Sequence, residues 1–356
     1  MSNFLVFDLK VIDSPQAGLG VARCLKSLGH IVYGADDTPF VTNSDLFEKT
    51  FVIDELRSLN LDNLLKKLIQ IKEIYSIEYI VPCYDETVIL FSYLKDKLDF
   101  IGIKLIAPGL DSIRAFRKDN LSNIFSYVDL TTPETNLVTS LKEADKYANI
   151  IGYPIFVKGM TKGAFPASNR YELESAINKI SSIWNNGEIN CLIQKAIRGK
   201  YINVLLAYKN KSIVAYAEME KIGLDVNGAT WFGKITTSRN LFNSCILLLE
   251  NTNLTNSIIE IETIKSDDGK YYVYEVNLRP PAWIYASALN GLNFFDAFLN
   301  VENKTIFNTN EVYFGRETKE FIKDISDISE FSNLQYYTKG AAYKTNNLKY
   351  PSELML

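Results

Sequence analysis

The chain has 356 residues, of which 47% are apolar and 22% are charged, and its formal net charge is −4. This length allows two or three domains with cores of their own, and the net charge argues against a general binder of nucleic acid. The four cysteines lie far apart without a CxxC pair, so we expect neither a zinc site nor a disulfide framework, and a reducing cytoplasm fits best. The N-terminus predicts no signal peptide, and no apolar run approaches the length of a membrane span.

Residues 1–108 alternate between strand and helix patterns. Short apolar runs predict strands, and amphipathic runs between them predict helices, the first of which repeats apolar residues at helical spacing before Gly29 ends it. The strands are expected at 4–9, 31–37, 77–83 and 104–108, a loop followed by a helix at 13–30, and further helices at 61–75 and 86–98. Alternation of this kind predicts a parallel α/β sheet. Asp85 and Glu86 follow the third strand and could face a ligand, although an N-cap role is the simpler interpretation of Asp85.

The pattern changes after Pro108 to an α+β region. One long helix is expected at 110–128, and further helices at 140–152 and 169–184. Strands dominate from Tyr153 onward, at 153–159, 190–197, 201–208, 211–220, 256–265 and 270–278. The tail from 301 is less regular and carries one candidate strand at 340–345.

The strands expected at 256–265 and 270–278 form a predicted hairpin that carries acidic residues. The Asp-Gly pair at 268–269 indicates a two-residue turn. With that turn, Glu262 opposes Glu275 and Glu260 opposes Asn277, and alternation places all four on one face. The other face looks like core and carries Ile259, Ile261, Tyr274 and Val276.

Like charges that face each other across a β-ladder repel, so the acidic face needs an explanation. Solvent exposure is one, because a polar face is common in antiparallel sheets. A divalent cation is the other. A set of Glu and Asn oxygens without His or Cys suits Mg²⁺ better than Zn²⁺, and Mg²⁺ commonly shares its protein ligands with substrate phosphates.

This hairpin, "IEIETIKSDDGKYYVYEVNLRP", resembles the metal-binding hairpin of ATP-grasp enzymes, which usually ends in Glu-x-Asn-x-Arg. Glu275, Asn277 and Arg279 match that motif. The resemblance implies that Glu275 and Asn277 bind Mg²⁺ (or Mn²⁺) ions that bridge the phosphates of ATP. It implies a further ligand on the preceding strand, with Glu262 as first choice and Glu260 as second. It also implies that Arg279 contacts phosphate or an acyl-phosphate intermediate.

The same resemblance, which is best over residues 110–300, implies roles for other residues. Lys158 and Lys118, the latter in the helix "FRKDN", would bind the phosphates, and Lys221 would be a further cation for phosphate or substrate. A loop after Lys158 that includes Gly163 would cover the phosphates, although it is poorer in glycine than the family's loop and could be a plain surface connection. Adenine would meet the backbone at Gln194, Lys195, Ala196 and Ile197. No residue is assigned to the ribose.

The implied architecture is a parallel α/β domain at 1–108 that precedes the ATP-grasp domain, then a two-lobed ATP-grasp domain at 109–300 with its lobes joined near 191–200. A C-terminal segment at 301–356 would complete the fold. The implied activity is ATP-dependent ligation of a carboxylate to an amine through an acyl phosphate, with an amino acid or small peptide as substrate. The partners would be small molecules, with neither nucleic acid nor membrane, and a homodimer is compatible with the sequence. Trp231 and Trp283 flank the site and are candidates for contact with the acceptor.

Two other classes of function remain. "GLGVAR" after the first strand, with Asp36 after the second, is close to the dinucleotide-binding pattern of a Rossmann NAD(P)-dependent oxidoreductase, but Arg23 stands at its third glycine position. A non-catalytic nucleotide-binding protein is the other class. Intact Glu275, Asn277 and Lys158 argue against a degenerate site.

Overall fold

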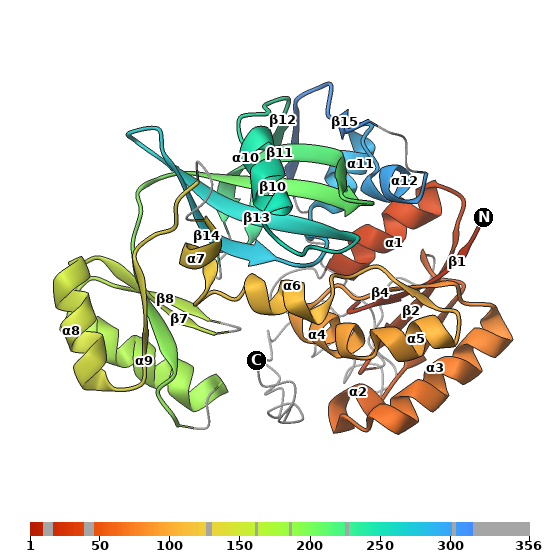
Figure 1. Cartoon of the computed structure of the whole chain (residues 1–356), viewed down its shortest axis with the longest axis horizontal. Coiled ribbons are helices and arrows are strands. Elements are labelled where there is room, and N and C mark those ends of the chain that lie inside the picture. The colour runs from red at the N-terminus through yellow and green to blue at the C-terminus, as the bar shows by residue number, and fades with distance from the viewer. Residues whose placement is uncertain are drawn as a thin grey trace, which may run out of the picture.

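The computed structural model describes residues 1–9, 17–38, 46–125, 130–160, 163–184, 187–224, 228–300 and 304–315. Three sheets organise this part of the chain (Figure 1). The candidate strand at 340–345 and most of the C-terminal segment lie outside the described residues. Within the described residues, no helix combines the length and the apolar character that a membrane crossing requires.

The first sheet is parallel, as the sequence predicts, with the strand order β3-β2-β1-β4-β5. The side chain of Asn60 caps helix α3, because it accepts from the amide of Asn63. Strand β3 and the short helix α2 were not predicted. The elements are β1 Asn3–Phe7, α1 Ala17–Ser27, β2 Ile31–Asp36, β3 Lys49–Val52, α2 Glu55–Ser58, α3 Leu61–Tyr75, β4 Tyr79–Val81, α4 Asp85–Tyr93, α5 Lys95–Phe100 and β5 Lys104–Leu105.

Helix α1 packs closely at both of the glycines that suggested a dinucleotide site. A Cβ on Gly18 would lie 2.5 Å from the carbonyl oxygen of Asp8, at the end of β1. A Cβ on Gly20 would lie 3.2 Å from Cγ2 of Ile284, the first residue of α11 (Ile284–Leu289). Close packing of α1 therefore accounts for both glycines, and the dinucleotide interpretation has no support from them.

A smaller antiparallel sheet of order β6-β9-β7-β8 forms the lobe at the left of Figure 1, together with α8 and α9. Two side chains cap the start of α8. The Ser140 hydroxyl accepts from the Glu143 amide, and the Glu143 carboxylate accepts from the amide of Thr139, the residue before Ser140. Strand β8 was not predicted. The elements are β6 Thr135–Val138, α8 Leu141–Ile151, β7 Ile155–Gly159, β8 Ala164–Ala167, α9 Arg170–Trp184 and β9 Cys191–Lys195.

The largest sheet has the order β14-β13-β10-β11-β12-β16, with β15 beside β11. One face packs on α10, α6 and α7, and the other packs on α1, α11 and α12. Strands β12, β15 and β16 were not predicted. The elements are α6 Leu110–Ala115, α7 Leu121–Phe125, β10 Gly199–Lys209, β11 Ser212–Leu224, β12 Thr230–Thr236, α10 Phe242–Glu250, β13 Ser257–Ser266, β14 Tyr271–Asn277, α11 Ile284–Leu289, α12 Phe294–Leu299, β15 Ile306–Phe307 and β16 Val312–Gly315.

The single long helix predicted at 110–128 is wrong. The chain forms α6 and α7 with a turn between them, and Lys118 lies in that turn. The side-chain amide of Asn120 donates to the carbonyl oxygen of Ala115 at 2.9 Å, and Arg117 pairs with Asp119 at 2.9 Å. These local bonds compete with continued helix and bend the chain toward the acidic hairpin.

Candidate functional site

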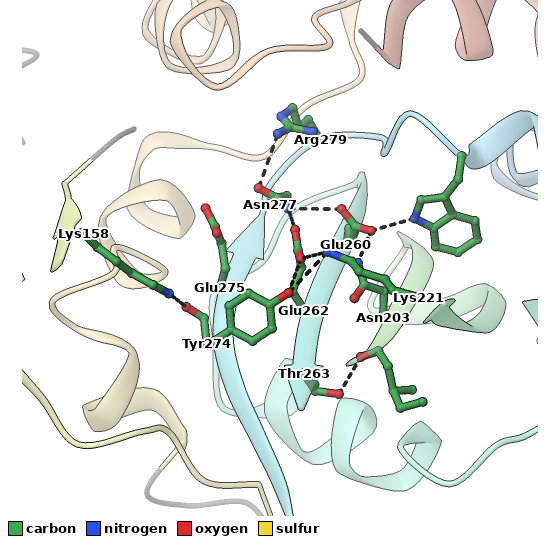
Figure 2. Close-up of polar contacts among 12 residues, drawn as sticks. Lys158, Asn203, Lys221, Glu260, Glu262, Thr263, Tyr274, Glu275, Asn277 and Arg279 are labelled. Atoms are coloured by element: carbon green, nitrogen blue, oxygen red, sulfur yellow. Dashed lines mark hydrogen bonds and ion pairs between the residues drawn. The ribbon is translucent and has the colours of Figure 1, made fainter. Parts of the chain in front are cut away.

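The acidic hairpin of β13 and β14 has the predicted register at its functional end. Glu262 opposes Glu275, and Glu260 opposes Asn277 (Figure 2). The predicted two-residue turn is wrong, because the amide of Ser266 donates to the carbonyl oxygen of Lys270 at 2.9 Å and closes a three-residue loop. Gly269, with φ of 86°, supplies the left-handed residue of this loop. A β-bulge between the loop and the acidic pairs restores the predicted register.

Because of the bulge, the side chain of Tyr274 does not lie on the face of the sheet that the sequence predicts. Tyr274 has no partner on β13, because Thr263 pairs with Val273 and Glu262 pairs with Glu275. Its side chain therefore leaves the apolar face, where alternation placed it, and its hydroxyl donates to Oε2 of Glu262 at 2.5 Å. Tyr274 is thus a site residue that the sequence pattern assigned to the core.

Glu262 is the most heavily bonded of the predicted metal ligands. It accepts from Nζ of Lys221 at 2.5 Å and from the side-chain amide of Asn277 at 2.7 Å, in addition to Tyr274. Burial alone would raise the pKa of Glu262, but the Lys221 ammonium and these hydrogen bonds lower it to about 2. Burial lowers the pKa of Lys221, but the nearby carboxylates, first Glu262 and then Glu260, outweigh it and raise that pKa.

Glu260, the second choice for a metal ligand, points into the protein. Its side chain is only 5% exposed and accepts from Nε1 of Trp283 at 2.7 Å and from the amide of Asn203 at 2.6 Å. Burial, followed by the charge of Glu262, raises the pKa of Glu260. The other carboxylate oxygen accepts from Asn277 at 3.1 Å, so Glu260 positions a predicted ligand. Trp283 is buried against this carboxylate and is not exposed to an acceptor, contrary to expectation.

Asn203 belongs to this cluster, although no sequence argument singled it out. It lies on β10 opposite Glu262 and is fully buried. Its Oδ1 atom has no hydrogen-bond partner among the described residues. An Asn inside the apolar run "YINVLLAY" was the available signal, because a buried amide needs partners.

Glu275 pairs with Lys118 across the boundary between hairpin and turn. Nζ of Lys118 lies 3.0 Å from Oε1 of Glu275, and the two side chains are 16% and 26% exposed. The turn between α6 and α7 therefore places Lys118, predicted to bind phosphate, beside Glu275, predicted to bind the metal ion.

Lys158 reaches the hairpin from β7 of the smaller sheet and is 5% exposed. Its Nζ donates to the carbonyl oxygen of Tyr274 at 3.4 Å and lies 4.9 Å from the centre of the Tyr274 ring. Burial, only partly opposed by Glu275, lowers the pKa of Lys158 to about 8. Among the interactions that the structure describes, no carboxylate forms an ion pair with this ammonium. Its charged form is therefore stabilised by the face of the Tyr274 ring and by more distant charges such as that of Glu275.

Arg279 connects the hairpin to the first domain. Its Nε donates to Oδ1 of Asp85 at 3.0 Å, and its Nη2 lies 3.4 Å from Oδ1 of Asn277. Asp85 is the first residue of α4 and Tyr84 is the N-cap, so the expected capping role of Asp85 is wrong. Burial lowers the pKa of Arg279, but Asp85 and Glu260 outweigh it and raise that pKa above its ordinary value.

The predicted adenine segment lies where β9 of the smaller sheet leads into β10 of the larger one. The amides of Lys195 and Ala196 already donate to the carbonyl oxygens of Glu134 and Pro154, at 2.9 and 3.3 Å. The side chain of Gln194 donates to the hydroxyl of Thr135. The amide of Ile197 has no hydrogen-bond partner within the described part of the chain, so it is the donor of this segment that a base could use.

Gly163, with φ of 84°, ends a turn between β7 and β8, where the amide of Gly159 donates to the carbonyl oxygen of Gly163 at 2.9 Å. The turn is shorter than the expected loop, because β8 begins at Ala164. Residues 161 and 162 lie outside the described residues, so the covering role of the loop stays a prediction.

The oxygen donors of this face fit a hard divalent cation that shares its ligands with phosphate. Glu262, Glu275 and Asn277 supply carboxylate and amide oxygens, with no His or Cys among them. Within the described ranges, no three His, Cys, Asp or Glu side chains are grouped so that they could hold a metal ion by themselves. A cation at this face would therefore complete its coordination with ligand or water oxygens.

Comparison with known proteins identifies the fold. No protein-family model matches the chain. Biotin carboxylase from Campylobacter jejuni has a similar structure, with a TM-score of 0.66 and 16% identity, over 84% of this chain and 70% of that one. N5-carboxyaminoimidazole synthetase from Staphylococcus aureus gives 0.63 and 14%, over 84% and 76%. L-amino acid ligase from Bacillus licheniformis gives 0.62 and 13%, over 84% and 74%.

These similarities establish the predicted fold, a parallel α/β domain followed by an ATP-grasp fold.

Proposed function

We propose that the protein is an ATP-dependent ligase that joins a carboxylate to an amine and releases ADP and phosphate. The observation that carries this proposal is the opposed pair Glu262–Glu275, next to Asn277, with four cationic side chains around it on an ATP-grasp fold. Lys221 and Lys118 form ion pairs with Glu262 and Glu275. Lys158 donates to the carbonyl oxygen of Tyr274, and Arg279 contacts Asn277. Such convergence suits a ligand with several negative charges.

The residues present fit Mg²⁺ or Mn²⁺. Glu262, Glu275 and Asn277 would hold the cation, which, when bound, would neutralise charge on the phosphates of ATP and orient them. Arg279 lies 3.4 Å from the Asn277 oxygen, close enough to meet a phosphate oxygen held at this face.

The chain's own groups would perform the rest by position and charge. The reaction brings a carboxylate against a triphosphate, and the two anions repel each other. Lys158 and Lys118 would bind phosphate oxygens, while Lys221 and Arg279 would stabilise the charge that passes to the acyl phosphate. An amine would then attack the acyl carbon, form the amide and release phosphate. No protein nucleophile is required, and all four cysteines are buried.

We further propose that the substrate is an amino acid or a small peptide, because the similar structures include an enzyme named as an L-amino acid ligase. The nucleotide would lie between the smaller and the larger sheet, with its base at the Ile197 amide and its phosphates at the hairpin. The first domain would contribute to the acceptor site, since its Asp85 already contacts Arg279.

Phosphate release tests the proposal. The purified chain is incubated with Mg²⁺ and ATP and with pairs drawn from a panel of acids and amines, and the products are examined for ADP and for the amide by mass spectrometry. Acid-dependent and amine-dependent phosphate release is expected. Thermal stabilisation by NAD(H) and not by ATP with Mg²⁺ would instead favour an oxidoreductase.

A further inference from the structure

Two ion pairs join the proposed metal ligands to two of the lysines at this face. Nζ of Lys221 lies 2.5 Å from Oε2 of Glu262, and Nζ of Lys118 lies 3.0 Å from Oε1 of Glu275 (Figure 2 shows the first pair). A lysine ammonium therefore contacts each of the two carboxylates that a divalent cation would use. A phosphate that takes either lysine, and a cation that takes either carboxylate, competes with a bond already present.

Because these side chains are buried, it is unfavourable for the cation alone, or the nucleotide alone, to break one of the ion pairs. The side chains of Lys221 and Glu262 are 5% and 12% exposed, so water cannot readily replace a lost partner. A cation that bound Glu262 alone would leave the Lys221 ammonium buried without its counter-charge. A nucleotide that took Lys221 alone would leave the Glu262 carboxylate in the same position. A buried charge that loses its partner is far less stable than one that gains a new partner of opposite charge.

We propose that the divalent cation and the nucleotide enter this site together by exchange of ion pairs, so that each is bound weakly without the other. In the exchange, Lys221 and Lys118 pass from Glu262 and Glu275 to phosphate oxygens, and the cation takes the two carboxylates. The number of charge pairs is conserved, and no charge is left alone. This inference rests on the proposed function, because it concerns the same site.

Other carboxylates do not offer Lys221 an alternative. Glu260, whose charge also acts on Lys221, already accepts from Trp283, Asn203 and Asn277 and is buried. Tyr274 lies beside both members of the pair, with its hydroxyl 2.5 Å from Glu262 and 3.3 Å from Lys221, but it is neutral. Lys221 can therefore leave Glu262 only when an incoming phosphate provides a new negative charge.

The test uses variants whose expected effects have opposite signs. Mn²⁺ alone is titrated into the full chain and followed by electron paramagnetic resonance, and ATP with Mg²⁺ is titrated by calorimetry. Lys221→Met removes the competing ammonium, so we expect it to bind Mn²⁺ alone about tenfold more tightly than the wild type and ATP with Mg²⁺ about tenfold more weakly. Lys200→Met is the matched control, because Lys200 pairs with Glu220 and is 72% exposed. It should change neither affinity.

The reciprocal variant tests the other half of the exchange. Glu262→Gln frees Lys221, so it should bind ATP in the presence of EDTA more tightly than the wild type, and ATP with Mg²⁺ more weakly. Lys118→Met, on the half-buried pair, should repeat the Lys221→Met pattern with a smaller change, and it covers the case in which Lys221→Met does not fold.

The outcomes separate this inference from the proposed function. If the variants lose affinity for ATP with Mg²⁺ but gain none for the separate ligands, the exchange is wrong while the nucleotide site stands. If the wild type binds Mn²⁺ alone as tightly as it does with nucleotide present, the exchange is also wrong. If the wild type binds no ATP under any condition, both the exchange and the proposed function fail.

Discussion

The hydroxyl of Tyr274 donates to Oε2 of Glu262 at 2.5 Å, although strict alternation along β14 would place Tyr274 on the opposite face of the sheet. The β-bulge that turns this side chain also sets its ring 4.9 Å from Nζ of Lys158. One neutral aromatic residue therefore contacts a proposed metal ligand through its hydroxyl and a proposed phosphate lysine through its ring.

The two contacts of Tyr274 can be separated by substitution. Tyr274→Phe keeps the ring beside Lys158 and loses the bond to Glu262, so we expect a lower kcat with little change in the KM for ATP. Tyr274→Leu removes the ring as well and should also raise the KM for ATP, by about tenfold, because the buried ammonium loses its cation–π contact. Steady-state phosphate release measures both effects. Tyr171→Leu is the control, because the Tyr171 side chain on α9 is 83% exposed. Equal KM values for ATP in the Phe and Leu variants would contradict the role of the ring.

Nucleotide binding should weaken as the pH rises through about 8. Burial lowers the pKa of Lys158 to about 8, so its ammonium loses a proton in a range where an ordinary lysine stays charged. A triphosphate favours the charged form, so ATP affinity should be full below this pH and fall above it. Calorimetry between pH 6.5 and 9.5 measures the change. Lys158→Met should bind ATP more weakly at all pH values and lose the step near pH 8; a step that persists in this variant belongs to another group.

Glu275→Gln should abolish turnover and leave the fold intact. The substitution keeps the shape of the side chain but removes the charge that would hold a divalent cation and that pairs with Lys118. We expect phosphate release to fall by at least about a hundredfold, with an unchanged circular dichroism spectrum. Glu311→Gln changes an exposed carboxylate at the edge of the same sheet and is the control. Near-normal ADP release by Glu275→Gln at saturating substrate would rule out the metal role.

Gly18→Ala should destabilise the protein through packing alone. The added Cβ would lie 2.5 Å from the carbonyl oxygen of Asp8 and 2.7 Å from that of Phe7, and backbone atoms at the end of β1 cannot move away cheaply. We expect a loss of ~1–3 kcal/mol in the free energy of unfolding, measured by denaturant titration. Gly109→Ala, whose nearest contacts are at 3.8 Å, should be tolerated.

The elements that the sequence specified well are those with a strong local period. The alternation in β13 and β14 predicts that the acidic residues share one face, but the pairing of Glu262 with Glu275 was predicted from a two-residue turn that is wrong, and the β-bulge restores that register. Most strands and helices of residues 1–108, though not β3 and α2, were predictable because apolar runs alternate there with amphipathic ones. Strands β3, β8, β15 and β16 have two to four residues each and were not predicted, because such short strands carry too few residues to show a period.

The rest of the site depends on contacts that no local pattern contains. The bulge at Tyr274 follows from the mismatch between a three-residue loop and the register of the acidic pairs. The bond between Arg279 and Asp85 joins residues 194 positions apart, and only the packing of the first domain on the hairpin creates it. Lys118 reaches Glu275 because side-chain bonds of Asn120 and Arg117 interrupt a helix that the apolar spacing favoured.

The hairpin also offers a place to modify the protein. The loop at 267–269 is exposed, and the bulge lies between it and the acidic pairs, so a change of loop length can be absorbed before it shifts Glu262 against Glu275. We therefore expect the sheet to accept a longer loop that carries a fluorophore or an affinity peptide, without compensating substitutions in the other strands. This would give a reporter attached to the same two strands that carry the proposed metal ligands.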